Sequence, residues 1–397
     1  MKVVVITHNY IRRQGDLTAL YLHRLSSGLV SKGIELTIVC PHAEGLLKED
    51  VIDGVRIKRF GYPFSNKKPI VYAGNMHEIV SRSLFAKMVF IGFLYSIYRF
   101  GLRVCREEKP DLIWANWWIP PGLAASKIAA KLNLPLIISS HGTDIALLGK
   151  PGIIQRLSKY VYRRTQRATV VSSFLNDILI NNLSVLSKDI VEVIPMPVGM
   201  ETFPRKPFND EGAPVFLSVA RYTKQKHLDS IIEAAEVLNN AGFEFRIIMV
   251  GEGPLEEKLK SLIAENNLED KIKLGPLVAQ QKLAKLYQAC DAVLLVSENE
   301  GFGLVLVEAG LTGRPTIGAN SGGIVDFIEH DKNGLLIEIG DYMALAECMK
   351  SIITDKQLRN RLGDGAYHTA RDKFATPVLV DKMYNLFETT ANYWKRK

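Results

Sequence analysis

Two glutamates separated by seven residues are the strongest chemical signal in this 397-residue sequence. Glu300 and Glu308 lie in SENEGFGLVLVEAGLTGRP, where a glycine-containing loop leads from an apolar strand into a helix. Free N–H groups at a helix N-terminus bind anions, and glycine lets a ligand approach the backbone closely. A neighbouring carboxylate can accept hydrogen bonds from two adjacent sugar hydroxyls. A cap or a surface residue would explain either glutamate alone, but together with the glycines they favour a binding site.

A basic loop is the second signal. Arg221 and Lys226 lie in ARYTKQKHLDSIIEA, between an expected strand and an expected helix. Two cations at the carboxyl end of a strand suit a diphosphate, because the charge of that leaving group must be neutralised before it departs. Loop cations are usually only solvated, but we expect this loop to lie opposite the glutamate motif, which favours binding.

Two further signals lie in the first half of the chain. His141 follows the apolar run LPLIIS and precedes Gly142 in SSHGTDI. A lone histidine is more often structural, but a position at a strand end beside a glycine favours a site. Gly15, in the first strand-to-helix turn HNYIRRQGDL, is a weaker signal for close approach of a phosphate. The stretch WANWWIPPG holds three tryptophans, which could stack on an acceptor sugar or pack in the core.

The elements that must position these residues alternate along the chain. Short apolar runs predict strands, and the apolar spacing in 16–32 predicts a helix. Such alternation is typical of a parallel sheet covered by helices on both faces. The pattern restarts after the Pro- and Gly-rich stretch 195–214, which indicates a linker between two domains. The predicted strands are 3–8, 35–40, 111–116, 134–139, 168–172 and 190–195, then 214–221, 245–253, 289–297 and 314–319.

We therefore predict an α/β chain of two Rossmann-like, doubly wound domains that face a central cleft. The predicted bounds are 1–195 for the first domain, 196–212 for the linker and 213–376 for the second domain. A last helix, about 377–397, is expected to pack back onto the first domain. Open parallel sheets bind ligands at the carboxyl ends of their strands, so the site should lie there.

Charge is distributed unevenly over a chain whose net charge is +8. Residues 1–200 carry 26 Lys and Arg against 14 Asp and Glu, whereas residues 201–397 carry 24 against 28. The basic first half favours an anionic partner such as a membrane surface, a phosphorylated lipid or an acidic sugar; a solvated basic face is the alternative.

The apolar segment 88–98, MVFIGFLYSIY, lies within this basic half. It is flanked by Lys87 and by a group of arginines, Arg99, Arg103 and Arg106. Its length is below the roughly 20 residues that cross a bilayer. It fits either a buried helix of the first domain or an interfacial helix that rests on anionic lipid.

The composition favours a globular protein in a reducing compartment. Hydrophobic residues make up 47% and charged residues 23%, which are ordinary globular values. The four cysteines lack the spacing of metal ligands or disulfides. The opening MKVVVITHN is too short for a signal peptide and fits a first strand. We expect a cytoplasmic protein without a metal cofactor and without a nucleic-acid partner.

Together, SENEGFGLVLVEA, ARYTKQKHL, SSHGTD and SGGIVDFI (321–328) resemble the motifs of family 4 retaining glycosyltransferases, which have the GT-B fold. The resemblance runs the whole length of the chain. It implies metal-independent transfer of a hexose-type sugar from a UDP- or GDP-linked donor to a glycan, lipid-linked or small-molecule acceptor. It further implies that 1–195 binds the acceptor and 213–376 the donor, in cell-envelope or glycoconjugate synthesis. The basic first half and the segment 88–98 suggest a lipid-linked or membrane-bound acceptor and a peripheral location at the inner face of the membrane.

The resemblance also implies roles for donor-side residues. Glu308 would hydrogen-bond the donor ribose, and Arg221 and Lys226 would hold the diphosphate. Gly15 would pass close to the distal phosphate, and the loop around Gly251 would border the nucleoside base. The donor sugar would be held by Glu300 together with the backbone of Gly301, Phe302 and Gly303.

On the same resemblance, His141 would lie near the transferred sugar, and it forms the predicted catalytic set with Glu300, Arg221 and Lys226. The acceptor-side residues would be Asp144, Trp117 and Trp118. Reaction with retention would have departure and attack on the same face of the sugar, and no protein nucleophile is evident.

The sequence departs from the family pattern in two places and leaves rivals open. Gly15 stands alone where paired glycines are common. PMPVGMETF (195–203) replaces the usual Pro-Asn-Gly-Val-Asp, so Met200 and Glu201 stand for the expected contacts. The rivals are a 2-epimerase or phosphorylase of the same fold, a sugar-binding module, and a dinucleotide-dependent dehydrogenase, although the first turn lacks G-x-G-x-x-G.

Overall fold

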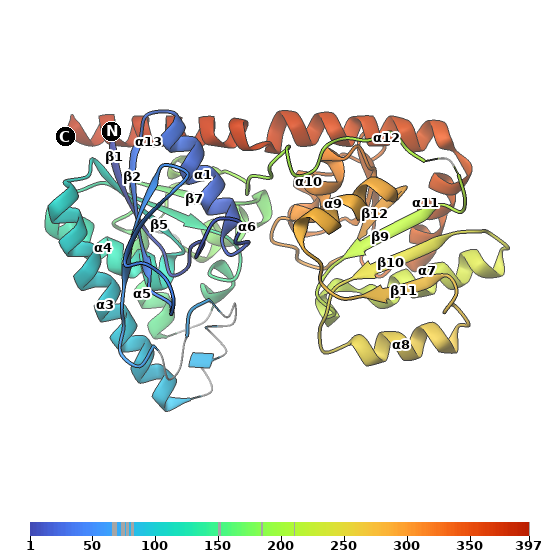
Figure 1. Ribbon diagram of the computed structural model, residues 1–397, viewed down its shortest axis with the longest axis horizontal. Coiled ribbons are helices and arrows are strands. Elements are labelled where there is room, and N and C mark those ends of the chain that lie inside the picture. Colours follow the sequence, from blue (N-terminus) through green and yellow to red (C-terminus); the bar gives the residue numbers. More distant parts are fainter. Residues whose placement is uncertain are drawn as a thin grey trace. The chain divides into compact units, whose positions relative to one another are not determined.

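A computed structural model describes residues 1–65, 70–72, 76, 79–80, 83–149, 152–183, 186–209 and 211–396. The chain forms two compact units, each with its own sheet and covering helices (Figure 1). The first unit comprises Met1–Val171, Leu175–Pro197 and Leu379–Lys397, and the second comprises Ser172–Phe174 and Val198–Val378.

The first unit is built on an eight-stranded sheet in the order β3-β4-β2-β1-β5-β6-β7-β8. Every neighbouring pair is parallel except β3 and β4, which form a hairpin through Asp53 and Gly54, both with positive φ. The two central strands β1 and β5 are almost wholly buried, which explains their continuous apolar sequence. The strands are β1 (Lys2–Ile6), β2 (Glu35–Pro41), β3 (Glu49–Ile52), β4 (Val55–Phe60), β5 (Leu112–Asn116), β6 (Leu136–Ser140), β7 (Arg167–Val170) and β8 (Val191–Val193).

Helices cover this sheet, and the end of the chain joins them. From Leu379 onward the last helix shares a buried cluster with α1 and β1, and Phe387 packs edge-on against Trp114 with ring centroids 5.4 Å apart. Gly28 permits the contact with α1, because a Cβ there would lie 2.4 Å from Val380 Cγ2. The helices are α1 (Leu20–Ser31), α3 (Leu84–Glu108), α4 (Leu123–Leu132), α5 (Ile153–Tyr162), α6 (Ser173–Asn182) and α13 (Thr376–Lys395).

The second unit is built on a six-stranded, all-parallel sheet in the order β11-β10-β9-β12-β13-β14. Its strands are β9 (Val215–Val219), β10 (Arg246–Val250), β11 (Ile272–Gly275), β12 (Ala292–Leu295), β13 (Thr316–Ala319) and β14 (Gly334–Ile337). Its helices are α7 (Leu228–Asn240), α8 (Glu256–Glu265), α9 (Gln280–Ala289), α10 (Leu304–Leu311), α11 (Tyr342–Thr354) and α12 (Lys356–Thr369).

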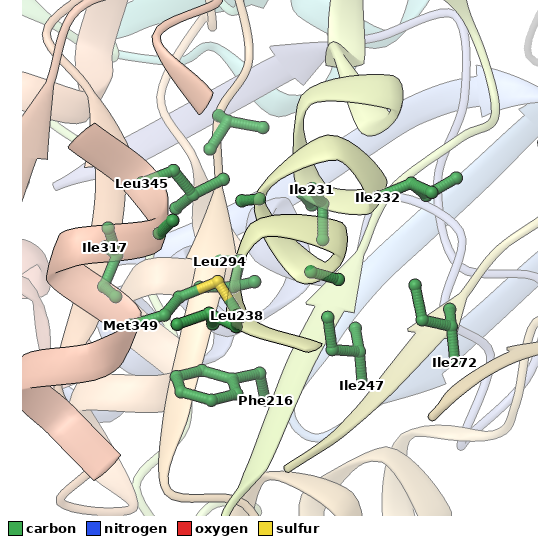
Figure 2. Close-up of a cluster of buried hydrophobic side chains, with 14 of the residues drawn as sticks. Phe216, Ile231, Ile232, Leu238, Ile247, Ile272, Leu294, Ile317, Leu345 and Met349 are labelled. Carbon is green, nitrogen blue, oxygen red and sulfur yellow. The ribbon is translucent and has the colours of Figure 1, made fainter. Parts of the chain in front are cut away.

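Apolar side chains from helices and strands of this second unit interlock in one core. Figure 2 shows Ile231 of α7 and Met349 of α11 directed toward Phe216 of β9 and Leu294 of β12. The sheet and its helices thereby share one core, and the loops at the strand ends lie at its edge. Short helical turns complete both units: η1 (Trp118–Gly122), η2 (Ile145–Leu147), η3 (Lys188–Ile190), η4 (Lys224–Lys226), η5 (Gly322–Asp326) and η6 (Ala370–Phe374).

The predicted α/β class with two parallel-sheet domains is confirmed, with two differences in extent. The segment 88–98 is only the middle of α3, a helix of 25 residues. The predicted linker is 196–212, and the chain passes from the first unit to the second at Pro197 and Val198. After that point the backbone is held by the second unit: Arg314 donates to the carbonyl oxygens of Lys206 at 3.0 Å and Pro207 at 3.2 Å.

Candidate active site

The donor-side residues predicted from sequence gather at one edge of the second sheet. β10, β9 and β12 are neighbours and parallel, so their carboxyl ends meet there. Gly251 follows β10, Arg221 follows β9, and Glu300 follows β12. The sheet topology therefore places these three loops side by side. The spacing of the motifs along the chain could not show this.

An ion pair joins two of these loops. Lys226 Nζ donates to Glu300 Oε2, and both side chains are largely buried, with 13% and 18% of their surface exposed. The amide of Gln225 adds hydrogen bonds to the carbonyl oxygens of Glu298 at 3.0 Å and Asn299 at 3.2 Å. Arg221 belongs to the same loop as Lys226, and its side chain is exposed. The edge thus presents a fixed carboxylate, a paired cation and an exposed cation.

The loop that carries Glu300 is held from behind by the SGG segment 321–323. The N–H of Gly323 donates to Glu300 O at 2.7 Å, and the N–H of Asn299 donates to Ser321 Oγ at 3.0 Å. A Cβ on Gly322 would lie 2.4 Å from Glu300 O, and one on Gly323 would lie 2.7 Å from Gly301 O. Only glycines fit, and their packing fixes the position of Glu300.

Glu308 lies in α10 and is oriented by a partner that sequence reasoning missed. The hydroxyl of Tyr287, on α9, donates to Glu308 Oε2 at 2.8 Å. Burial, reinforced by the Glu308 carboxylate, raises the pKa of Tyr287 well above its usual value, so the phenol stays protonated and donates. Glu308 is half-buried, and α10 begins at Leu304 after Gly303, whose φ is 84°.

Two other donor-side positions have structural explanations of their own. The side chain of Phe302 is buried and packs against Phe374 with ring centroids 5.6 Å apart, so only its backbone can meet a ligand. A Cβ on Gly251 would lie 1.9 Å from Ala220 O, because the loops after β9 and β10 touch there. The predicted roles of these residues toward the donor remain predictions.

The first unit gathers a different set of groups at the ends of β1, β5 and β6, which are neighbours in its sheet. His141 Nε2 hydrogen-bonds Asn116 Oδ1 at 3.1 Å. The ring of His8 lies 4.5 Å from that of Trp117, and the ring of Tyr21 lies 4.8 Å from that of His141. His8, Asn116 and Tyr21 were not predicted from sequence.

These groups are neutral and incompletely satisfied. Burial lowers the pKa of His8 to about 4 and, with His8 adding to the effect, that of His141 to about 3. Within the part of the chain that the structure describes, His8 Nδ1, His141 Nδ1 and Asn116 Nδ2 are buried without a hydrogen-bond partner. Buried polar atoms are nearly always paired, so three in one cluster indicate a place for a polar ligand.

Asp144 and Trp118, which were predicted on the acceptor side, are fully buried. Asp144 Oδ1 accepts from the backbone N–H of His141 at 3.0 Å and Gly142 at 3.2 Å, and Trp118 Nε1 donates to Asp144 O at 2.6 Å. Burial raises the pKa of Asp144, and these hydrogen bonds oppose that effect. The two residues shape the loop that carries His141, and their predicted roles toward an acceptor remain predictions.

Trp117 and Gly15 keep some access to solvent. Trp117 is half-buried, with φ 76°. Gly15 is exposed, with φ 79° and open space where a Cβ would stand. Its turn is closed by Asp16, which accepts from Arg12 Nε at 2.7 Å and from the N–H of Thr18 at 3.1 Å. Both predicted roles remain predictions.

Chemically, the second unit offers charges suited to a diphosphate and carboxylates suited to hydroxyl groups. The first unit offers neutral nitrogen atoms suited to hydroxyl groups alone. Among the described residues, His, Cys, Asp and Glu form no group of three or more that could hold a metal ion.

Two known families match successive parts of the chain. A family described as "Glycosyltransferase Family 4" matches residues 18–201, and one described as "Glycosyl transferases group 1" matches residues 199–369. The two matches together run through nearly the whole chain. The chain belongs to these glycosyltransferases, and it is an enzyme of that class.

Curated relatives and solved structures extend the match. N-acetyl-alpha-D-glucosaminyl L-malate synthase of Bacillus anthracis is 26% identical over 82% of this chain and 87% of its own. The lipopolysaccharide core biosynthesis glycosyltransferase LpsE of Rhizobium meliloti is 23% identical over 96% and 98%. Anabaena Alr3699/HepE, solved in complex with UDP, has a TM-score of 0.75 at 18% identity over 98% and 100%. The predicted family, the GT-B fold and the glycosyltransferase class are confirmed.

Proposed function

We propose that this glycosyltransferase moves a hexose-type sugar, with retention at the anomeric carbon, from a UDP- or GDP-linked donor to a glycan, lipid-linked or small-molecule acceptor. The observation that carries the proposal is the Lys226–Glu300 pair at the strand ends beside Arg221. A UDP-linked donor is the first choice, because Alr3699/HepE was solved with UDP.

The ion pair gives the donor two contacts at once. When a diphosphate binds, Lys226 and Arg221 neutralise its charge, which lowers the barrier to its departure as a leaving group. Glu300, released from Lys226, accepts hydrogen bonds from hydroxyls of the donor sugar. Glu308, held by Tyr287, accepts from the two ribose hydroxyls. We propose that these cations replace a metal ion, so that transfer proceeds in the presence of a chelator.

On the sugar side, His141 acts as a neutral hydrogen-bonding group. Its Nε2–H donates to Asn116 Oδ1, so Nδ1 carries a lone pair that can accept from a sugar hydroxyl. His8 offers a second neutral nitrogen nearby in the same unit. A cationic imidazole would repel developing positive charge at the anomeric carbon, so the lowered pKa values suit this chemistry.

We place the enzyme in the cytoplasm, peripheral to the inner face of a membrane, in cell-envelope or other glycoconjugate synthesis. The support is the basic first half of the chain and the similarity to a lipopolysaccharide core glycosyltransferase. An anionic, lipid-linked acceptor would accumulate at such a surface.

Ligand-induced thermal shift with UDP, GDP and ADP, each with EDTA, tests the donor site. A ligand that binds only the folded state raises the melting temperature by mass action. We expect one nucleotide to raise it in the wild type and in Glu257→Ala, a control glutamate exposed on α8, and much less in Glu308→Ala. No shift with any nucleotide would remove the main support for the donor assignment.

The nucleotide that binds then selects the nucleotide-sugars for a transfer assay. NMR of the first-formed product distinguishes the predicted retained anomer from an inverted one, which would contradict the proposal. Conversion of the nucleotide-sugar without transfer would indicate an epimerase instead.

A further inference from the structure

The helix α3 has one face that is buried in the first unit and one face that is exposed. Among the described residues it alone is long and apolar enough to cross a membrane, judged by length and composition. Its inner face is committed to the first unit, because Val89, Phe93 and Ile97 are buried and the helix packs against α4, β1, β2 and β4. A helix that covers a sheet cannot also be surrounded by lipid, so only its outer face is free for a partner.

The outer face is a single stripe with two chemically distinct halves. Leu84, Met88, Ile91 and Tyr95 are 79%, 61%, 66% and 63% exposed, and their spacing of four, three and four residues puts them on one side. The same stripe continues with the exposed cations Arg99, Arg103 and Arg106. Surface helices of water-soluble proteins normally show charged residues along this face, so an apolar half needs a covering partner.

The apolar half extends around the first turn of the helix. Phe85 is 37% exposed, and its ring lies 5.3 Å from that of Phe64, which is 53% exposed. Between Leu84 and Arg106 the helix carries no acidic residue. An apolar tip of this kind is suited to insertion among acyl chains.

The cationic half forms a groove of about 650 Å³ along α3. Its charged lining residues are the three arginines and Glu107, and its aromatic ones are Tyr95, Phe60 and Phe100. Arg103 lies 4.6 Å from the centroid of Phe100 and only 3.8 Å from Glu107, whereas Arg99 and Arg106 form no ion pair with any other described residue. The groove therefore holds three cations against one carboxylate, and this net positive charge suits a bulky anion.

We infer that α3 docks the enzyme on a bilayer that contains anionic phospholipid. The N-terminal half of the stripe enters the acyl region, and the three arginines bind headgroup phosphates in the groove. At the helical rise the apolar half is about 16 Å long and the cationic half about 10 Å, so the helix meets the surface at a slant, with Leu84 deepest. The order of apolar and then cationic residues along one stripe matches the order of acyl chains and headgroups in a leaflet.

This inference rests on the peripheral location in the proposed function and names the surface that produces it. It does not depend on which sugar is transferred. Docking is therefore measured without donor, and the UDP-induced thermal shift reports separately on the nucleotide site. Loss of one with retention of the other tells which proposal has failed.

The test is co-flotation of the full chain with vesicles of phosphatidylcholine alone or mixed with phosphatidylglycerol. We expect binding to the mixed vesicles that weakens in high salt, and little binding to the neutral ones. The triple variant Arg99→Gln, Arg103→Gln, Arg106→Gln should lower the partition coefficient about tenfold or more. The double variant Met88→Gln, Ile91→Gln should also lower it, because it removes insertion.

Matched controls keep the result specific. Lys258→Gln, Lys282→Gln, Lys285→Gln removes the same charge from exposed positions of α8 and α9, and Leu277→Gln, Met343→Gln removes exposed apolar residues elsewhere. Both controls should float as the wild type does. The inference would be overturned if the lysine control lost as much vesicle binding as the arginine variant. It would also be overturned if the wild type floated equally with neutral and mixed vesicles, or with neither kind.

An environment-sensitive fluorophore gives a second readout. Attached to Ile91→Cys, it should shift to the blue when mixed vesicles are added, and attached to Leu277→Cys it should not. Cys40, Cys105 and Cys290 are buried, whereas Cys348 is half-buried and is replaced by serine in both labelled variants. An unchanged spectrum at Ile91→Cys would contradict insertion.

Discussion

At the strand ends of the second unit, Lys226, Glu300 and Glu308 are each held by another side chain, whereas the neutral polar groups at the strand ends of the first unit are incompletely hydrogen-bonded. Lys226 pairs with Glu300, and Glu308 accepts from Tyr287. His8, His141 and Asn116, by contrast, each bury a nitrogen atom that no described residue satisfies.

This difference in charge and hydrogen bonding indicates how each unit binds its ligand. A charged group in a partly buried loop needs a counter-ion before its ligand arrives, and an internal carboxylate supplies one. A neutral imidazole can remain without a hydrogen-bond partner until its ligand binds, because leaving that bond unmade costs less free energy than burying an unpaired charge. The first arrangement suits a diphosphate and the second suits hydroxyl groups, so substitutions in the two units should fail in different ways.

The largest effect is expected where charge is removed from the second unit. Lys226→Ala should lower kcat about 100- to 1000-fold, because the leaving group loses a preorganised cation. The unfolding free energy should change by less than about 1 kcal/mol, since the pair remains partly solvated. Initial rates and denaturant unfolding measure the two quantities.

The control for this variant is Lys224→Ala, an exposed lysine in the same short helix η4. Its activity should stay near that of the wild type. If both variants lost activity equally, the general charge of the loop would be responsible and the specific pair would not.

The glycines of the two units should also differ. Gly251→Ala should destabilise the second unit by about 2–4 kcal/mol, because the new Cβ would meet Ala220 O and the backbone must move. Gly15→Ala should cost only about 1 kcal/mol, since its φ is positive but the space around it is open. Denaturant melts of both variants check the order, and a more damaging Gly15→Ala would contradict it.

Because His8 and His141 are buried and neutral, we expect the free energy of unfolding of the first unit to fall at acidic pH. Their folded pKa values, about 4 and about 3, lie below the unfolded value of about 6.5, so the unfolded chain binds more protons as the pH falls. Stability should therefore be complete above neutral pH and fall by about 2 kcal/mol for each histidine between pH 7 and pH 5. Denaturant melts across this range measure the slope, and His8→Gln should flatten it.

The smallest effect is expected from one neutral hydrogen bond in the first unit. His141→Gln should lower kcat/KM about tenfold and leave the UDP-induced thermal shift unchanged, because the second unit holds the nucleotide. His42→Gln, a histidine bound to the Leu46 carbonyl, serves as the control. A His141→Gln variant that lost nucleotide binding would break the division between the two units.

Local patterns in the sequence determined the fold class and the charged half of the candidate site. Alternating apolar runs and helical spacing depend on neighbouring residues only, and so does the succession of strand, loop and helix around Glu300 and Glu308. The motifs around Arg221, Lys226 and His141 could be placed at strand ends for the same reason. Their pairing across loops could not be predicted, because it depends on the order of strands in the sheet.

Only the tertiary structure decided which side chains are buried and what they contact. Asp144 and Trp118 follow strand ends as His141 does, yet they are enclosed by the loop they shape. His8 and Asn116 lie in stretches that were noted for other residues, and Tyr287 lies in none; the contacts of Asn116 and Tyr287 are with residues distant in sequence. Burial and long-range contacts depend on how strands and helices pack, which local sequence periodicity does not record.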